Sequence, residues 1–532
     1  MSTLKSNINI KSPLQVENKK LMSELIDKLN KHLEESRFQG KERHIEKAKK
    51  QGKLTARERI ELLLDQDSFF LELLPLIGLN GEGFGPGGTT VSGIGLVEGR
   101  LCLINANVGT NKGGAIDKAT LQKTTRISEI AAENGLTVVN LVESSGANLP
   151  EQEQIFNYGG VIFREITRRS RQGLTTISVV FGNSTAGGAY VPGMSDYSIF
   201  VKNNAKVFLA GPPLVKMATN EVVDEETLGG ADMHSRISGV SDYLAEDEYH
   251  ALKLSREIIR NLAKPEINYH PYQNILPPLY DKEEILSIVP ADVRKPFDAR
   301  ELIARIVDNS EFSEFKSNYG STLVCGFAQI EGYQMGILAN NGVLFSEAAN
   351  KGTHFIQLCN QQNIPLLFLQ NTTGFMVGSA YEQEGIIKHG AKLINAVSNS
   401  DVPTITIMIG SSYGAGNYAM NGRAYQPRFL FSYPNSQIAV MGPEQLTGVM
   451  TMIQRQAAEQ AGIPFDEENA AAVSEYMMQQ VRASSSAWYA TGQGWDDGII
   501  DPRETRTVLA VCLAVIHNKP VKGSEKYGIF RM

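Results

Sequence analysis

The fold is decided by the stretch Thr176-Ile-Ser-Val-Val-Phe-Gly-Asn-Ser-Thr-Ala-Gly-Gly-Ala-Tyr190, in which an apolar, β-branched run passes into a turn of small residues. The pattern returns 228 positions later in Thr404-Ile-Thr-Ile-Met-Ile-Gly-Ser-Ser-Tyr-Gly-Ala-Gly-Asn-Tyr418. Short, nearly continuous apolar runs are typical of strands that are buried on both faces in α/β proteins. We therefore expect two buried strands, each followed by a Gly-rich turn.

Further landmarks recur in the same order at nearly constant shifts. Glu98-Gly99 matches Glu331-Gly332 and Gly109 matches Gly342 at a shift of 233, Gly146 matches Gly374 at 228, and Gly211-Pro212 matches Gly442-Pro443 at 231. Chance rarely produces such an ordered series, and the period is far too long for a solenoid. The 532-residue chain is therefore predicted to contain two copies of one α/β domain, each within the usual size range.

The sequence also predicts how these domains are bounded. A charged, helix-favouring segment comes first, and in it Thr55 and Glu58 have the spacing of a capping box. Five prolines between positions 264 and 290 indicate a linker. We expect an N-terminal helical arm at 1–65, a first domain at 66–270, a Pro-rich linker at 271–295 and a second domain at 296–532.

Composition excludes several classes of protein. The net charge of −7 argues against an obligate nucleic-acid binder, which needs a basic surface. No run of about 18 apolar residues is present, so no membrane association is expected. The four cysteines form no C-x-x-C pair, and the histidines show no metal spacing, so no metal is predicted. The polar first twenty residues indicate a cytoplasmic protein, although a mature mitochondrial-matrix protein would look the same.

A nucleophile with its base is not evident. Ser412 lies in the G-x-S-x-G match 410–414, but the only histidine after it is His517, so a turn serine is the simpler interpretation. His234 and His389 are interpreted as loop or packing residues. No phosphate-binding P-loop is present, and the glycines of 83–88 precede a strand-like run, so they indicate an ordinary loop.

The paired Gly-rich turns are the better candidates for chemistry. If a helix follows each turn, its first N–H groups are unpaired and favour negative charge, which is the requirement for an oxyanion hole. The alternative is that these glycines serve only tight strand–helix packing. Two matched turns favour ligand binding, because packing alone does not require small residues at both sites. Two such holes without a nucleophile suggest that the protein stabilises negative charge on two carbonyl-like oxygens and that one ligand supplies the base.

Several stretches carry a resemblance to a known family. They are Arg57-Glu-Arg-Ile60, Lys112-Gly-Gly114, Ser184-Thr-Ala-Gly-Gly-Ala-Tyr-Val-Pro192, Phe208-Leu-Ala-Gly-Pro-Pro-Leu-Val-Lys216, Leu228-Gly-Gly-Ala-Asp232, Leu366-Leu-Phe-Leu-Gln-Asn371, Gly374-Phe-Met-Val-Gly378, Tyr413-Gly-Ala-Gly-Asn-Tyr418, Gly422-Arg-Ala-Tyr425, Trp495-Asp-Asp-Gly498 and Gly528-Ile-Phe-Arg-Met532. In these motifs the chain resembles the carboxyltransferase β subunit of biotin-dependent acyl-CoA carboxylases, in the methylcrotonyl-CoA and geranyl-CoA carboxylase branch.

The resemblance implies two tandem crotonase-like (ClpP/crotonase) domains and a homo-hexameric β core. It implies that the first domain binds the coenzyme A thioester, that the second binds carboxybiotin, and that the two meet between facing subunits. The catalytic oxyanion holes then fall at Gly187 and Gly188 and at Ala415 and Gly416. In the implied mechanism carboxybiotin loses CO2, the biotin anion removes a proton from the thioester, and the resulting enolate attacks CO2.

The same resemblance suggests substrate-binding residues around each hole. On the acyl-CoA side they are Ala186, Gly146, Gly159, Gly160, Lys112, Gly113, Gly114 and Arg126, and on the biotin side Gly374, Phe375, Tyr413 and Gly414. Lys112 and Arg126 are candidates for contact with the CoA phosphates. Gly159 replaces a bulky ring of methylcrotonyl-type relatives and would leave room for a longer acyl chain, although it could equally be a turn glycine. The basic run Arg164, Arg168, Arg169 and Arg171 indicates a solvated helix face, with CoA phosphate contact as the alternative.

The chain contains neither a biotinylation motif nor an ATP-binding loop. We therefore expect an alpha subunit as partner that carries the biotin carboxylase and biotin carrier domains. Three alternatives remain open: a biotin-dependent acyl-CoA decarboxylase, a carboxylase specific for acetyl- or propionyl-CoA, and a non-catalytic scaffold that docks the biotin carrier.

Overall fold

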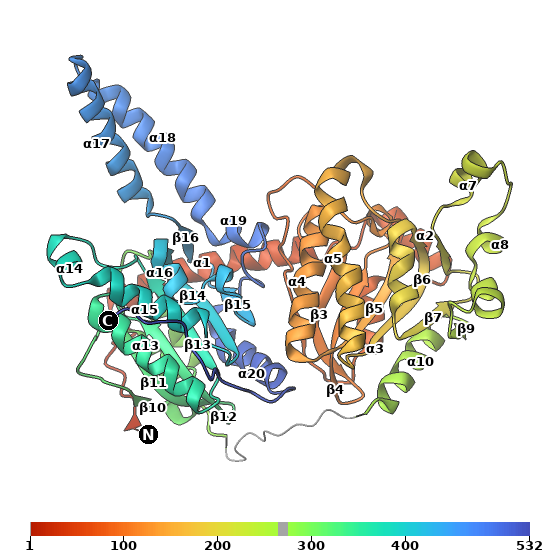
Figure 1. Ribbon diagram of the computed structural model, residues 1–532, viewed down its shortest axis with the longest axis horizontal. Helices are drawn as coiled ribbons and strands as arrows, with labels where there is room; N and C mark the ends of the chain where they lie inside the picture. The colour runs from red at the N-terminus through yellow and green to blue at the C-terminus, as the bar shows by residue number, and fades with distance from the viewer. Residues whose placement is uncertain (1, 264–274) are drawn as a thin grey trace.

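Two α/β domains lie side by side in the computed structural model, which describes residues 2–263 and 275–532 (Figure 1). Each domain is built on an eight-stranded sheet. The strands of the first sheet are β2 (Phe70–Glu72), β3 (Thr90–Val97), β4 (Arg100–Asn107), β5 (Thr137–Ser144), β6 (Thr176–Thr185), β7 (Tyr197–Val201), β8 (Lys206–Phe208) and β9 (Tyr243–Ala245). Those of the second are β1 (Ser2–Thr3), β10 (Glu311–Glu314), β11 (Leu323–Ile330), β12 (Tyr333–Asn340), β13 (Leu366–Thr372), β14 (Thr404–Tyr413), β15 (Phe429–Ser432) and β16 (Gln437–Ala439).

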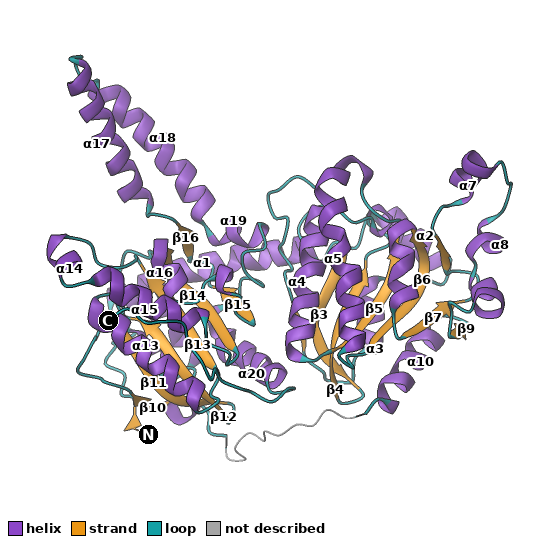
Figure 2. Cartoon of the chain, in the orientation of Figure 1, coloured by secondary structure: helices purple, strands orange, loops and turns teal. Residues whose placement is uncertain are grey.

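Helices cover both faces of each sheet (Figure 2). Up to the end of the first domain they are α1 (Pro13–Ser36), α2 (Glu42–Lys50), α3 (Ala56–Leu63), α4 (Lys118–Asn134), α5 (Gln152–Arg171), α6 (Tyr190–Met194), α7 (Pro212–Thr219), α8 (Glu225–Gly229), α9 (Ala231–Met233) and α10 (Glu248–Asn261). The later helices are α11 (Ile285–Ile288), α12 (Ala299–Ile303), α13 (Ser346–Gln361), α14 (Ser379–Gln383), α15 (Ile386–Ser398), α16 (Gly414–Ala419), α17 (Pro443–Ala461), α18 (Glu467–Ser485), α19 (Ala487–Gly492) and α20 (Thr505–Ile516).

Both sheets have the same topology, which confirms the predicted duplication. An antiparallel hairpin, β3–β4 or β11–β12, is followed by parallel strands, β4–β5–β6–β7 or β12–β13–β14–β15. The register shifts just before Ser144 pairs with Ser184, and again before Thr372 pairs with Ser412, so even this irregularity recurs at 228 positions. The two buried strands predicted from the sequence are β6 and β14.

The repeat extends to ion pairs that the sequence did not reveal. In the first domain Arg256 of α10 contacts Asp65 and Glu98, and the Asp65 carboxylate accepts the N–H group of Gly99 at the β3–β4 turn. In the second domain Arg506 of α20 contacts Asp308 and Glu331, and Asp308 accepts the N–H group of Gly332. Helices α10 and α20 are therefore equivalent, and each ties a hairpin turn to its own domain.

The predicted single arm at 1–65 is wrong, because the structure divides this segment between the two domains. Strand β1 pairs with β10 at the edge of the second sheet, and α1 packs against α11. Helix α3, which begins with the predicted capping box at Thr55 and Glu58, packs on the first sheet. Its Arg57 binds Glu72 with two hydrogen bonds of 2.9 Å. Arg300 of α12 binds Glu314 in the same two-bonded way, at 2.9 and 2.6 Å, so α3 is an integral part of the first domain.

The described part of the predicted linker at 271–295 also needs correction. Residues 264–274, which contain the predicted boundary at 270, lie outside the described residues. Beyond them α11 contributes Ile285 and Leu286, 1% and 2% exposed, to the largest apolar cluster. A segment that enters the core is not a linker, and proline content alone does not report burial.

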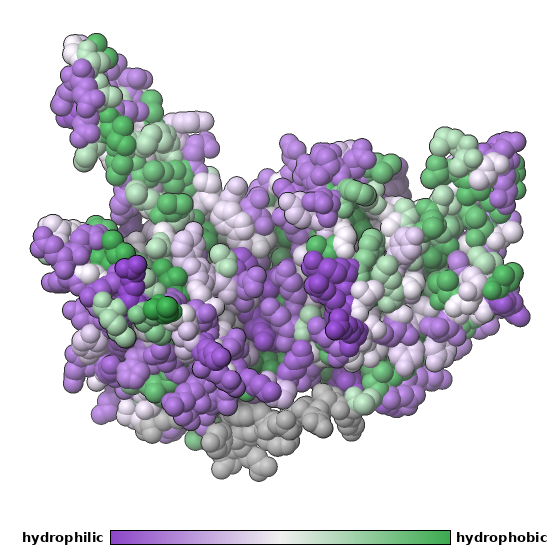
Figure 3. Space-filling view, viewed as in Figure 1, coloured by the Kyte–Doolittle hydropathy of each residue, from purple (hydrophilic) through white to green (hydrophobic). Residues whose placement is uncertain are grey.

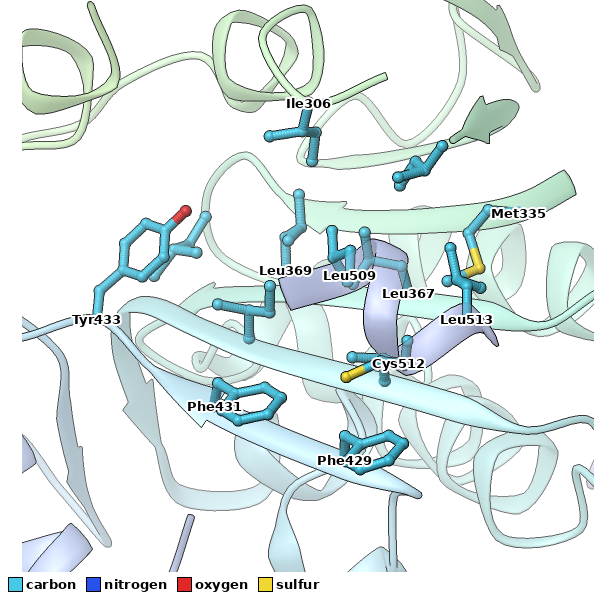
Figure 4. Packing of buried hydrophobic residues seen from close by; sticks show 14 of the residues in the cluster. Ile306, Met335, Leu367, Leu369, Phe429, Phe431, Tyr433, Leu509, Cys512 and Leu513 are labelled. Atoms are coloured by element: carbon cyan, nitrogen blue, oxygen red, sulfur yellow. The ribbon is translucent and has the colours of Figure 1, made fainter. Parts of the chain in front are cut away.

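That cluster joins the two domains. It contains Ile127 and Ile130 of α4 in the first domain together with Leu367 of β13 and Leu509 of α20 in the second. Figure 4 shows Leu509, Cys512 and Leu513 of α20 lying over Phe429 and Phe431 of the second sheet. Because burial of apolar surface supplies most of the stability of a fold, the shared core holds the domains in one arrangement.

A buried ion pair lies at the same junction. Asp497, which is fully buried, accepts hydrogen bonds from Nε and Nη2 of Arg126 at 2.8 and 3.1 Å, from Nη2 of Arg423 and from the N–H group of Leu430. Arg126 Nη2 also donates to the carbonyl oxygens of residues 427 and 428. The prediction that Arg126 binds a CoA phosphate is therefore corrected: its guanidinium group joins α4 to the second domain.

Among the described residues no helix is both long enough and apolar enough to cross a lipid bilayer.

Removing the charge of Asp496 and removing that of its neighbour Asp497 should have opposite effects on the stability of the fold. Burial alone would raise the pKa of Asp497, but Arg126 and Arg423 lower it to about 2. The ionised carboxylate therefore stabilises the fold at pH values above 3.8, the ordinary pKa of an aspartate. Burial raises the pKa of Asp496 to about 6, so ionisation of Asp496 opposes folding at neutral pH. We expect Asp497→Asn to lower the thermal denaturation midpoint strongly, with a loss of about 3–5 kcal/mol. Asp496→Asn should leave the midpoint unchanged or raise it.

Thermal denaturation of the two variants between about pH 8 and about pH 5 tests this. Any gain from Asp496→Asn should shrink as the pH falls, because the wild-type carboxyl group then takes up its proton. Equal destabilisation by both substitutions would contradict the assignment.

Candidate active site

The first Gly-rich turn lies at the carboxyl end of β6. Strand β6 ends at Thr185, and a 3₁₀ turn over Ala186–Ala189 leads into α6. Ala186 has a left-handed backbone with φ of +55°, which L-residues adopt at a cost, and strain of this kind is often found at functional sites. Gly187 is exposed, and its amide precedes the first i→i+3 hydrogen bond of the turn, so it has no carbonyl group one turn earlier to pair with.

The second turn repeats this geometry at the end of β14. The first residue of α16, Gly414, has φ of +53° and occupies the position equivalent to Ala186, 228 residues later. Ala415 is exposed, whereas Gly416 is buried against the neighbouring turn. A Cβ atom on Gly416 would lie 2.9 Å from Cα of Gly374, so this position accepts only glycine. Both turns therefore present helix-initiating amides at a strand end.

A second loop supports each turn in the same way. The N–H group of Gly146 donates to Ser144 Oγ at 3.2 Å, and that of Gly374 donates to Thr372 Oγ1 at 3.1 Å. Both glycines have a positive φ, of +95° and +118°. A Cβ atom on Gly146 would lie 3.2 Å from the carbonyl oxygen of Thr185, so the structure brings this predicted residue next to the first Gly-rich turn.

The predicted residues 112–114 form a short 3₁₀ turn beside the first hole. The carbonyl oxygen of Gly114 accepts a hydrogen bond of 2.6 Å from Ser144 Oγ, and that of Gly113 accepts the N–H group of Ser145. Lys112 is exposed, and its Nζ atom lies 5.7 Å from the ring centroid of Phe84. Lys112 therefore keeps an exposed side chain on this short turn, in contrast to the buried Arg126.

Gly159 and Gly160 lie inside α5, which excludes the turn-glycine interpretation. No atom lies within 4 Å of the place that a Cβ atom would take on either residue. Glycine inside a helix costs about 1 kcal/mol relative to alanine. One turn further along α5, the ring of Phe163 lies 3.3 Å from the place of a Cβ atom on Gly187, so this helix borders the first Gly-rich turn.

The biotin-side candidates Phe375 and Tyr413 are partly or fully buried. Phe375 packs against the apolar cluster beneath α13 and α15. The Tyr413 hydroxyl donates to Gln437 Oε1 at 2.5 Å, and burial raises the pKa of this phenol. The side chain lines a cavity of about 290 Å³ together with Thr373, Glu444 and Arg482, and the sequence did not single out these last three.

Ser412 has no histidine partner among the described residues, whereas His234 does contact a serine, with its Nδ1 atom 2.7 Å from Ser238 Oγ. Ser412 is fully buried; its hydroxyl donates to Gln370 Oε1 and accepts from Asn417 Nδ2, both at 2.7 Å. His234 Nε2 lies 2.7 Å from the carbonyl oxygen of Val207, which fits a packing role. Among residues 2–263 and 275–532, no three His, Cys, Asp or Glu side chains are grouped to hold a metal ion.

The arginines of the basic run on α5 differ in their exposure to solvent. Arg164 and Arg168 are 53% and 60% exposed, as a solvated face requires, but Arg169 is 3% exposed. The solvated-face interpretation is wrong for Arg169. The spacing of Arg169 from Ile162 and Ile166 places it on the inner face of the helix, so this pattern could have predicted its burial.

The two left-handed residues allow a matched test of backbone strain. Ala186→Gly should raise stability by about 1–2 kcal/mol, because glycine adopts a positive φ without steric cost. Gly414→Ala should lower it by a similar or larger amount, since a Cβ atom there also lies 3.1 Å from the carbonyl oxygen of Val440. Thermal denaturation midpoints measure both, and a loss of stability in Ala186→Gly would contradict the repeat.

Comparison with known proteins agrees with this geometry. Residues 47–528 match the family model described as the carboxyl transferase domain. The chain is 53% identical over 512 residues to a probable biotin-dependent acyl-coenzyme A carboxylase beta2 subunit of Mycobacterium tuberculosis, covering 96% of both chains. It is 47% identical to the mitochondrial methylcrotonoyl-CoA carboxylase beta chain of Arabidopsis thaliana, covering 96% of this chain and 89% of that one.

A solved structure gives the same result for the fold. The beta subunit of P. aeruginosa geranyl-CoA carboxylase is 40% identical, with a TM-score of 0.88 over 99% of each chain. This likeness confirms the predicted duplicated crotonase-like fold. With its matched Gly-rich turns on two copies of one α/β fold, the chain belongs to the carboxyl transferase family.

Proposed function

We propose that this chain is the carboxyltransferase (β) subunit of a biotin-dependent acyl-CoA carboxylase that acts on an unsaturated, branched acyl-CoA, in the class of 3-methylcrotonyl-CoA and geranyl-CoA. The observation that carries the proposal is the pair of equivalent turns with free helix-initiating amides, one in each domain. The named activities of the relatives support the substrate class.

The first turn acts on the thioester. The amides of Gly187 and Gly188 lie at a strand end, where a thioester oxygen can approach because neither residue has a side chain. Donors fixed in this way stabilise the negative charge of an enolate, and each is typically worth about 2.7–4 kcal/mol of barrier. Lys112 and the turn over Gly113 and Gly114 border the path of the CoA moiety.

The second turn fits the ureido oxygen of a biotin group. Ala415 and Gly416 offer amides, and Tyr413 lines the adjoining cavity, which has room for a small bicyclic ring. Carboxybiotin, when bound, supplies the carboxyl group and a base. The residues of this chain hold the oxygen on which charge develops, and the buried packing of Gly416 against Gly374 keeps that turn rigid.

The partners follow from the same proposal. An alpha subunit with biotin carboxylase and biotin carrier domains delivers the carboxyl group, and further copies of this chain form a hexameric core. Exposed apolar side chains support association: Met452 and Tyr476, on the long hairpin of α17 and α18, are 61% and 64% exposed, and Met217 of α7 is 77% exposed. Figure 3 shows apolar residues gathered on both projections.

A carboxylation assay tests the proposal. The chain is combined with a biotin-carrying alpha subunit, ATP and bicarbonate, and acetyl-, propionyl-, 3-methylcrotonyl- and geranyl-CoA are compared by kcat/KM. We expect turnover with preference for the unsaturated, branched thioesters. Preference for acetyl- or propionyl-CoA would contradict the substrate class, and decarboxylation without ATP-dependent carboxylation would contradict the direction.

A valine at position 188 tests the first hole. Its Cβ atom would lie 3.5 Å from Ser184 Oγ, an ordinary contact, so Gly188→Val should fold and assemble. Its methyl groups would fill the space of the thioester oxygen, and we expect kcat/KM to fall by about 100-fold or more. Gly193→Val, on the next helix with no atom within 4 Å of its Cβ position, is the matched control. Equal activity of the two variants would remove Gly188 from the site.

A further inference from the structure

A cavity of about 80 Å³ extends from the first hole into the first domain. It lies between the sheet and the helices α4 and α5, which run side by side across that face (Figure 2). Gly188 and Ser184 line it, as do Ser128 of α4 and Arg169 of α5. Ile162, Ile166 and Arg169 line it from one face of α5, so Arg169 lies about 10 Å along the helix from Ile162.

Arg169 is buried without a matching charge. Its Nη1 atom donates to Ser128 Oγ, whereas its Nε atom has no partner among the described residues. No carboxylate of the described residues lies within 4.0 Å of its guanidinium group. Burial lowers the pKa of Arg169, and Glu165 and Asp196 compensate only from a distance. A buried cation with an unused donor is costly unless a ligand or ordered water completes its partners.

The duplicated domain shows that the fold does not need these polar groups. Asn105 of β4 pairs with Asn140 of β5, and the equivalent pair in the second sheet is Leu338 and Phe368.

On the helices, Ser128 corresponds to Ile356 and Arg169 to Val397, both at a shift of 228. All four second-domain counterparts are at most 6% exposed and form one apolar cluster. At these four positions the first domain thus places polar groups in a largely apolar cavity, where its copy has a packed apolar core.

We propose that this cavity receives the far end of the acyl chain and that Arg169 there binds an oxygen of the substrate, in the first place a carboxylate. This inference rests on the proposed function and refines its acyl group. The preferred substrate is a CoA thioester whose apolar middle segment packs against Ile162 and Ile166 and whose end is a hydrogen-bond acceptor. Arg169 is then a specificity-determining residue that leaves the reacting atoms untouched.

The test compares three CoA thioesters of equal chain length: a branched enoyl-CoA that ends in a methyl group, its ω-hydroxy analogue, and the monothioester of the corresponding unsaturated dicarboxylic acid. Wild-type holoenzyme should carboxylate the dicarboxylic thioester with the highest kcat/KM. Arg169→Met fills the position with an apolar side chain of similar length. It should lower that kcat/KM by about 10- to 100-fold while leaving or raising that of the methyl-ended thioester. Arg168→Met, exposed on the same helix, is the control.

A binding measurement separates this inference from the proposed function. Calorimetric titration of the assembled β core with each thioester reports recognition of the chain end without any transfer chemistry. Tighter binding of the dicarboxylic thioester, lost in Arg169→Met, would support the inference even if carboxylation failed. If the wild type prefers the methyl-ended thioester in both assays and Arg169→Met leaves the ratio unchanged, the polar groups hold only buried water and the inference is wrong. If the wild type prefers the ω-hydroxy analogue over the dicarboxylic thioester, the proposal that Arg169 binds a carboxylate is wrong.

Discussion

The site depends on one constraint: an amide that binds a ligand oxygen must begin a helix without being covered by its own chain. Both domains satisfy this constraint with a residue in the left-handed conformation between strand and helix. This residue is Ala186, with φ of +55°, in the first domain and Gly414, with φ of +53°, in the second. This residue turns the chain so that the following amides point away from the strand. Parallel strands place such turns at one edge of a sheet, where the loops of Gly146 and Gly374 support them from the next strand. The retention of an alanine in one of the two turns shows that the conformation, not the glycine itself, is what both copies share.

Duplication also shows which features belong to the fold and which to a ligand. The hairpin turns held by Arg256 and Arg506 recur in both domains, so they are structural. Glu143 and its counterpart Asn371 differ, although each occupies the space left by a glycine on the neighbouring strand, Gly182 or Gly410. Burial alone would raise the pKa of Glu143, but Arg59 and Lys53 lower it, so the first domain holds a charge where the second holds an amide. The buried polar groups around Arg169 are a divergence of the same kind.

The sequence predicted the elements better than it predicted their partners. The run 176–182 and the capping box at Thr55 and Glu58 were predictable, because apolar periodicity and capping are local signals, and the structure contains both the strand and the box. The two turns were predictable because they occur twice. Arg126 was not, since its partner Asp497 lies 371 positions away and no local pattern reports such a contact. The helix at 285–288 was missed for a related reason: prolines indicate a stiff backbone, whereas the burial of a segment depends on which distant residues pack against it.

The shared core limits how the two holes can cooperate. Apolar residues of α4, α20 and the second sheet pack into one cluster, and Asp497 ties α4 to the second domain through a charge pair that is costly to open. A hinge between the domains would expose this cluster and break the pair, so the two turns keep a fixed separation within one chain. Reactants held at separate turns can then meet only if a carried group moves or if another copy of the chain brings its own turn opposite. The hairpin of α17 and α18, which exposes apolar side chains, and the segment of α7 project from the same side of the molecule (Figure 1), which gives a second copy a surface to contact. Under the proposed function, rigidity within the chain thus leaves the task of bringing the reactants together to further copies of the chain and to the carrier.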